Sequence, residues 1–285
     1  MHENPIPPED ADDLRQSNRV RRVAGLEWLL AGLLVLGLLA GAFAFLKSSQ
    51  QNAELERAFW VVGHASFLVP ERQAAFQRLV AAGNKEWRGA YLSGLNLADA
   101  KLPGVDLHDS DLEDCNLARA SLARARLKGV RLAFADLTEA DLSEADMTAA
   151  NLFKTHLARS SFRQARLRGA VLEQVDATGV TFLAADLGEA LCLMADFTGA
   201  NFTSADFTGA SLEAAVLRRA NLTFALMAGV DLRDADFTDA NWWRARRLTT
   251  EQIAKLRKVF PPSADAPPVL RQDYEAWLRE TATEK

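Results

Sequence analysis

The chain is poor in the residues that form most reactive sites. It contains two cysteines and four histidines among its 285 residues. The histidines are His2, His64, His108 and His156. They are too scattered to predict a metal or nucleophile site, and no G-x-S-x-G, H-E-x-x-H, C-x-x-C or phosphate-loop motif is present. We therefore expect no enzyme, and no catalytic, cofactor-binding or metal-binding residues.

A strong excess of one charge is also missing. The net charge is −5, and residues 88–247 hold 18 basic and 22 acidic side chains. Nucleic-acid-binding domains are usually strongly basic, and a nucleic-acid mimic must be strongly acidic. The mixed charge therefore predicts no nucleic-acid partner.

A period of five dominates the middle of the chain. Every fifth residue from Leu92 to Trp242 is apolar, over 31 consecutive positions. Because 49% of the residues are hydrophobic, the odds of such a run are roughly one in several billion. Leu fills twenty of these positions and Phe six, and the residue two places earlier is Ala in 21 cases. Each group of five therefore supplies one large and one small apolar side chain.

This period fits neither regular element. An amphipathic helix needs apolar residues three and four apart, and a half-buried strand needs them two apart. The remaining positions are mostly Asp, Asn, Ser, Thr, Gly, Glu, Arg and Lys, which favour turns and tolerate water. The chain must therefore turn every five residues and form a solenoid with short sides.

Units such as Ala140-Asp141-Leu142-Ser143-Glu144 resemble the pentapeptide-repeat family, over about residues 88–246. The resemblance implies an all-β solenoid, a right-handed quadrilateral β-helix in residues 88–247. Each unit of five would form one side, four units would form a coil of twenty, and the large and small apolar residues would point inward. Residues twenty apart would then stack.

Stacking predicts the structural core. The inward residues that we single out are Leu142, Phe162, Phe182, Phe202 and Trp242. Cys115 and Cys192 also fall on inward positions, 77 residues apart. That separation is about 18 Å along the stack, too far for a disulfide bond.

The outward columns predict polar ladders. Charges alternate in sign along one column: Asp106, Arg126, Asp146, Arg166 and Asp186. Amides recur along another: Asn201, Asn221 and Asn241. Both patterns are typical of side chains that stabilise successive coils.

A third column places His156 between Asp136 and Asp176. An imidazole between two carboxylates allows a catalytic or metal-binding alternative. A regular polar column on an outer face is the simpler interpretation.

Residues 28–46 form a run of nineteen residues without a charge, close to the length of about 20 that a membrane helix needs. We predict a transmembrane helix at residues 23–47, with the lipid bilayer as partner of residues 28–46. Arginines cluster before it: Arg15, Arg19, Arg21 and Arg22. The positive-inside rule then makes residues 1–22 a cytoplasmic polar tail. The expected location is single-pass in the bacterial inner membrane, with the repeat domain periplasmic or extracytoplasmic.

Two alternatives concern this segment. Ala42-Phe43-Ala44 fits a signal-peptide cleavage site, in which case the repeat domain would be released. Gly37 and Gly41 form one GxxxG motif, which leaves a homodimer open.

Helices should close both ends of the solenoid, because its open ends expose apolar interior and unpaired backbone. Residues 48–87 are predicted as helical linker and N-terminal cap, with a helix over Glu71–Ala82. Residues 248–285 are predicted as C-terminal cap and amphipathic tail helix. Thr249 and Gln252 have capping-box spacing at the start of a helix that reaches Val259.

The tail helix carries Leu270, Tyr274, Trp277 and Leu278 on one side. It either docks back on the solenoid, with Trp243 as a receiving residue, or binds a partner. Trp243, Tyr274 and Trp277 are therefore the candidate interaction residues.

Together these observations favour a membrane-anchored, non-enzymatic scaffold that binds an unknown protein partner at the cell envelope. The family resemblance implies an alternative, a nucleic-acid mimic that binds or protects a DNA topoisomerase.

Overall fold

The computed structural model describes residues 53–58, 60–62 and 68–283. The chain divides into two units, Met1–Arg57 and Ala58–Lys285. Of the first unit, residues 53–57 are described, and they are helical. The coils, helices and sites below all belong to the second unit.

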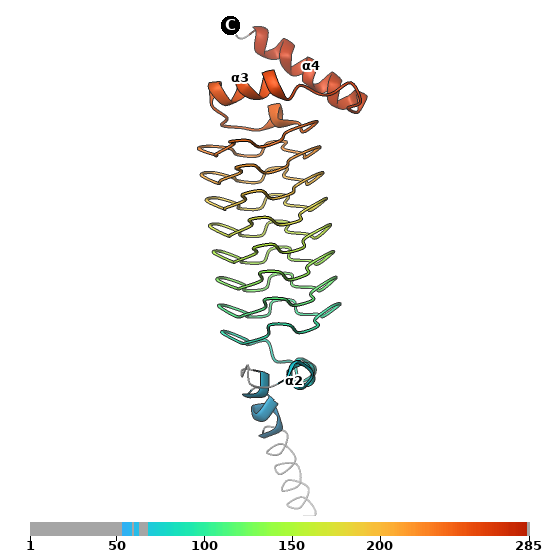
Figure 1. The fold of residues 1–285 in the computed structure, drawn as a ribbon, viewed down its shortest axis with the longest axis vertical. Coiled ribbons are helices and arrows are strands. Elements are labelled where there is room, and N and C mark those ends of the chain that lie inside the picture. The colour runs from blue at the N-terminus through green and yellow to red at the C-terminus, as the bar shows by residue number, and fades with distance from the viewer. Residues whose placement is uncertain (1–52, 59, 63–67, 284–285) are drawn as a thin grey trace, which may run out of the picture. The chain divides into compact units, whose positions relative to one another are not determined.

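The second unit is a stack of coils (Figure 1). Parallel bridges join residues twenty positions apart, as between Asp106 and Arg126 or between Asn201 and Asn221. A bridge recurs every five residues from Glu86 onward, so each coil of twenty has four bridged sides. Twenty residues is the coil length that the family resemblance implies.

Hydrogen bonds explain why the chain turns every five residues. The amide of Ala145 donates to the carbonyl of Leu142 at 3.1 Å, and the second of the two residues between them, Glu144, has a φ of +61°. The bridge residue supports this turn, since Asp141 Oδ1 accepts from the amide of Ser143 at 3.0 Å. Asp and Asn recur at this position because their short side chains can reach an amide two residues on.

The same unit is bonded to the coils on both sides. The amide of Asp141 donates to Ala120 in the preceding coil at 2.9 Å, and the amide of Leu142 donates to Ser161 in the following coil at 2.7 Å. Buried backbone groups need such partners. The sides of the solenoid therefore have few free backbone donors and acceptors.

The interior is filled by the period-five residues. All of the 31 positions are buried except Leu232, which is half-buried. Leu142, Phe162, Phe182, Phe202 and Trp242 are completely buried, and the rings of Phe162 and Phe202 each stack on Phe182 at 5.1 Å between centroids. Two buried free thiols belong to the same interior, and burial raises the pKa of both Cys115 and Cys192 to about 12.

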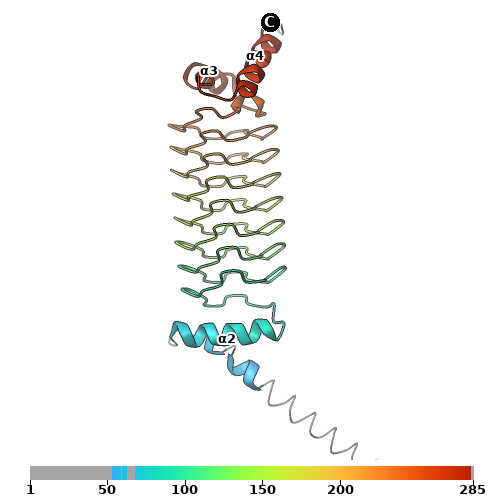
Figure 2. The ribbon, with the colours of Figure 1, turned by 90° about the vertical axis from the view of Figure 1, so that its right-hand side faces the viewer.

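Helix α2, Val69–Ala81, runs across the first coil (Figure 2). Phe76 packs on Trp87 at 4.5 Å between ring centroids. The buried Arg72 donates to the carbonyls of Tyr91 at 3.1 Å and Ser93 at 2.9 Å. Since no coil precedes this one, α2 provides both the apolar cover and the donors that a preceding coil would supply.

The other end is closed by the 3-10 helix η1, Trp242–Arg244, and by helices α3, Thr250–Val259, and α4, Pro268–Thr283 (Figure 1). The capping box forms as predicted: Gln252 N donates to Thr249 Oγ1 at 3.1 Å, and Thr249 N donates to Gln252 Oε1 at 2.9 Å. Gln252 Nε2 also donates to the carbonyl of Val230 at 2.9 Å. The buried Leu256 supplies the apolar contact of α3.

Among the helices that lie in the described ranges, none combines the length and apolarity that a bilayer span needs. The predicted helix at residues 23–47 lies outside the described residues. So do the polar tail, residues 1–22, the Ala42–Ala44 site and the GxxxG motif. These features stay predictions.

The inward and outward positions should differ sharply in their contribution to stability. We expect Leu142→Ala to lower the free energy of unfolding by about 2–5 kcal/mol, because the residue is fully buried. Leu191 is an outward bridge residue, 44% exposed, and Leu191→Ala should cost less than about 0.5 kcal/mol. Urea unfolding followed by circular dichroism measures both. Equal losses would contradict the assignment of the inward face.

Candidate interaction surface

The column of alternating charge, from Asp106 to Asp186, forms fewer ion pairs between successive coils than the sequence predicts. Along the alternating column an ion pair forms at one step, where Arg126 Nη2 lies 2.7 Å from Asp106 Oδ2. Within the described ranges, no other step of that column brings opposite charges within 4 Å. The Asp146 and Asp186 side chains instead accept from the backbone of their own turns. The alternating ladder is therefore correct in its positions and wrong in most of its contacts.

Asp106 is the most buried of these carboxylates, with its side chain 3% exposed. Burial alone would raise its pKa. The hydrogen bond from the His108 amide, at 3.1 Å, and the charges of Arg126 and Arg88 together hold the pKa of Asp106 below its ordinary value. The Asp106 carboxylate therefore links its own coil to the preceding coil through Arg88 and to the following coil through Arg126.

The amide ladder forms near the C-terminal end and includes threonines. Asn241 Nδ2 donates to Asn221 Oδ1 at 2.9 Å and to Thr223 Oγ1 at 3.0 Å. Asn221 Nδ2 donates to Thr203 Oγ1 at 3.1 Å. Asn201 is therefore linked to Asn221 through a neighbouring hydroxyl and not directly.

The histidine column does not form a compact site. Asp136, His156 and Asp176 are bridged in successive coils, but His156 is exposed and makes no ion pair within the described part of the chain. Each carboxylate turns back on its own repeat: Asp136 accepts from the amide of Thr138 at 2.9 Å, and Asp176 accepts from that of Thr178 at 3.1 Å. Across the described residues, no three metal-ligating side chains come together.

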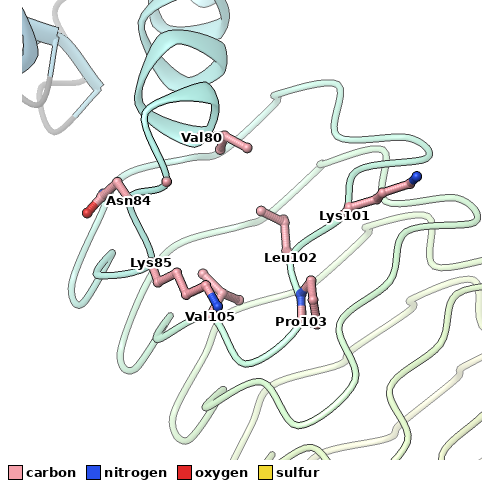
Figure 3. Close-up of a pocket in the computed structure, with 8 residues that line it drawn as sticks. Val80, Asn84, Lys85, Lys101, Leu102, Pro103 and Val105 are labelled. Atoms are coloured by element: carbon pink, nitrogen blue, oxygen red, sulfur yellow. The ribbon is translucent and has the colours of Figure 1, made fainter.

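A small pocket of about 70 Å³ lies between the end of α2 and the first coils (Figure 3). Apolar side chains such as Val80 and Leu102 line it, together with Asn84, Lys85 and Lys101. Lys85 and Lys101 are exposed, and Figure 3 shows Lys101 extending away from Lys85. The two amines therefore do not converge on a common point.

Helix α4 packs against η1 at the C-terminal end of the solenoid. Trp243 Nε1 donates to Asp273 Oδ2 at 2.8 Å, and the same carboxylate binds Arg244. The rings of Trp243 and Tyr274 lie 4.8 Å apart, and both residues are buried. Trp277 packs on Trp242 at 5.4 Å. The three candidate interaction residues thus lie together in the cap, and their role toward a partner stays a prediction.

One outer face carries exposed apolar side chains that the period of five does not reveal. It consists of the outward residues of the eight units centred on Leu92, Leu112, Leu132, Leu152, Leu172, Cys192, Leu212 and Leu232, and we call it the Leu92 face. Four successive coils of this face carry an apolar patch, formed by Phe134, Phe153, Val171, Leu191, Leu193 and Met194. Phe134 and Met194 are 52% and 51% exposed. Larger exposed apolar surfaces commonly mark binding sites.

The contacts within the patch are few. Phe134 packs edge-on against Phe153 at 5.6 Å between centroids, and the Lys154 amine lies 5.2 Å from the Phe153 centroid. The signal for this patch was present at twenty-residue spacing, since positions 134 and 194 belong to one column. Residues five apart lie on different faces, so the period of five does not reveal an apolar column on one face.

The fold is a solenoid with a buried apolar interior, in which successive coils are bonded to one another through their backbone and side chains project from the faces. A model of pentapeptide repeats matches the chain in eight copies across residues 88–246, more than half of its length. The chain belongs to the pentapeptide-repeat family, whose fold is a right-handed β-helix. Proteins of this family are generally structural or interaction proteins and not enzymes.

Several solved structures are similar. HetL, a pentapeptide repeat protein involved in heterocyst differentiation regulation in the cyanobacterium Nostoc, is 29% identical, with 60% of this chain and 95% of HetL covered and a TM-score of 0.26. QnrB1, a plasmid-mediated fluoroquinolone resistance protein, is 17% identical, with 59% and 83% covered and a TM-score of 0.43. A pentapeptide repeat protein of the Arabidopsis thaliana thylakoid lumen is 25% identical, with 54% and 88% covered and a TM-score of 0.18. No curated protein matches this chain in sequence.

The buried carboxylate should make stability depend on pH. Because the folded pKa of Asp106 is lowered, its charge stabilises the fold above the unfolded pKa of about 4, and this contribution is lost as the pH falls through the folded pKa. Asp106→Asn should therefore lower the urea midpoint at pH 7, and the difference from the parent should shrink as the pH falls below the unfolded pKa of about 4 and through the lowered folded pKa. Asp114→Asn is the control, because Asp114 is exposed and forms no ion pair with any residue that the structure describes, and it should leave the urea midpoint unchanged at each pH. A difference in urea midpoint between Asp106→Asn and the parent that stays constant as the pH falls would contradict a stabilising role of the Asp106 charge.

Proposed function

We propose that this protein is a membrane-anchored, non-enzymatic scaffold that binds another protein through the faces of its repeat domain, at the cell envelope. The observation that carries the proposal is the apolar patch, whose side chains are exposed or half-buried on four successive coils although the solenoid has a buried apolar interior. Exposed rings and methionine at such a place suit a protein contact.

The architecture supports contact through side chains. Successive coils consume the backbone donors and acceptors of the sides, and the two ends are covered by α2 and by α3 with α4. A rigid stack with flat faces can hold a partner in a fixed position, as other repeat solenoids do.

The membrane anchor rests on sequence. Residues 28–46 carry no charge, and four arginines precede them within residues 15–22. These features favour one span with the repeat domain on the extracytoplasmic side of a bacterial inner membrane.

The alternative, a mimic of nucleic acid that binds a DNA topoisomerase, requires a run of acidic side chains. Basic residues interrupt the acids on every face of this solenoid, as Lys154, Arg159, Arg163 and Arg168 do on the four faces. The charge pattern therefore favours the scaffold.

Site-specific photo-crosslinking in living cells tests the scaffold role without disturbing the fold. A photoreactive amino acid would replace one exposed turn residue on each face: Glu139, Ala149, Met194 and Ser204. We expect at least one position to cross-link to a different protein, because a scaffold must hold its partner against a face. Absence of cross-links from all four faces, with the variants folded and expressed, would contradict a scaffold.

A reporter fused after Lys285 tests the membrane assignment. We expect alkaline phosphatase at this position to be active, which requires export, and a cytoplasm-dependent fluorescent protein to be dark. The mature protein should retain residues 1–44 and remain in the membrane after alkaline extraction. Cytoplasmic fluorescence would contradict the predicted side, and loss of residues 1–44 would establish the cleaved signal peptide instead.

A further inference from the structure

The fold does not require the largest side chains of the apolar patch. Phe134 and Met194 occupy the turn position of their repeats, with φ of +60° and +54°. Most of the non-glycine residues that the structure describes in this left-handed region are polar or charged, as at Glu139 and Lys154, and glycine fills the equivalent position at Gly199. Because both side chains point to solvent, they add little to the core. The turn therefore does not require a large apolar side chain at either position, which suggests a role outside folding.

The backbone of the Leu92 face is closed to an added strand. The amide of Val171 donates to Ala150 at 2.9 Å, and its carbonyl accepts from Leu152 at 2.7 Å. The neighbouring Leu191 is bonded in the same way, its amide to Ala170 at 2.9 Å and its carbonyl to Leu172 at 2.7 Å. A partner must therefore bring its own satisfied backbone, which an α-helix does.

Charge distinguishes this face from a neutral apolar surface. It carries seven acidic and three basic residues: Asp111, Glu113, Asp114, Glu173, Glu213, Asp231 and Asp234, against Arg131, Lys154 and Arg233. Arg131 pairs with Asp111 and Glu113, and Arg233 pairs with Glu213 and Asp231. What remains is an excess of negative charge.

The unpaired acids flank the patch. One turn column runs from Asp114 through Phe134 and Met194 to Asp234, and both acids are exposed. Within the described ranges neither acid lies within 4 Å of a basic group. The two charges between the apolar ends, Lys154 and Glu173, have opposite sign. The Leu92 face is therefore acidic at both ends of the stack. Between these ends it carries the apolar patch and no net charge.

We propose that the Leu92 face binds an amphipathic helix of a partner protein, with apolar side chains on the patch and Lys or Arg near Asp114 and Asp234. Phe134 and Met194 are three coils apart, about 14 Å, and the two acids are six coils apart, about 29 Å. A helix of about 19 residues lying along the stack spans the longer distance. This inference rests on the proposed scaffold role and specifies the chemistry of the partner.

A synthetic peptide tests the proposal directly. The probe is a fluorescein-labelled helix of about 19 residues with leucines along one face and lysines at both ends. A matched peptide carries glutamates in place of the lysines. Fluorescence anisotropy would measure their binding to the full-length protein in nanodiscs of phosphatidylcholine, with empty nanodiscs as background. We expect the lysine peptide to bind at least about tenfold more tightly than the glutamate peptide.

Two sets of variants locate the binding. Phe134→Ser combined with Met194→Ser should weaken the lysine peptide at least about tenfold, since serine is accommodated at the same turn position at Ser204. Phe224→Ser, at a turn residue 50% exposed on another face, is the matched control and should change nothing. Asp114→Asn combined with Asp234→Asn should remove the preference for lysine over glutamate.

Several results would overturn the proposal: no binding of either peptide, equal binding of both, or an equal loss in the Phe224→Ser control. Native mass spectrometry tests the other possible occupant of the patch, a second copy of this chain. A parent protein that is dimeric and a Phe134→Ser and Met194→Ser variant that is monomeric would identify a second copy on the patch. That result would overturn the proposal of a partner helix. The scaffold role is tested separately, by cross-links from the four faces.

Discussion

The structure depends on one constraint, that every coil must satisfy the backbone of the coil on either side while a packed column of apolar side chains fills the interior. A buried amide without an acceptor is costly, so the repeat length, the turn and the inward residues have to agree. At Leu142 the three requirements meet in one unit: the side chain is buried, its carbonyl closes the turn at Ala145, and its amide bonds the next coil. Asp141 adds the acceptor that its own turn lacks.

The same constraint makes the ends special and leaves the faces as the natural binding surfaces. At the first coil, α2 brings Phe76 as cover and Arg72 as donor. At the last coil, α3 binds Val230 through Gln252, and α4 binds Trp243 through Asp273. The two ends of a solenoid are the places where unpaired backbone could bind another chain as an added strand. Because the helices cover both ends here, such pairing is blocked. The proposed binding of a partner therefore has to use side chains on the faces.

The sequence predicted the interior well because burial follows the local period of five, which is visible along the chain. It predicted the coil contacts less well. Asp146 and Asp186 have opposite-charge neighbours in their column, yet their carboxylates accept hydrogen bonds from the amides of their own turns instead. Leu232 keeps the period but is half-buried. The apolar patch needs the twenty-residue period, since Phe134 and Met194 meet only after the chain has coiled. The position of α4 depends on the shape of the last coil, which no period encodes.

Residue-resolved amide hydrogen exchange over residues 107–222 tests the central claim most directly. In the repeats of this range four amides are bonded to backbone, except that Val175 lacks such a bond and Leu222 donates to the Asn241 side chain. The fifth amide, directly after the inward residue, depends on a side chain. The account predicts slow exchange with a five-residue period, and faster exchange at Arg163, Leu183 and Leu193 than at Thr178 and Thr203, whose amides are bonded to Asp176 and Asn201. Uniform protection, or a period of three to four residues as in helices, would contradict it.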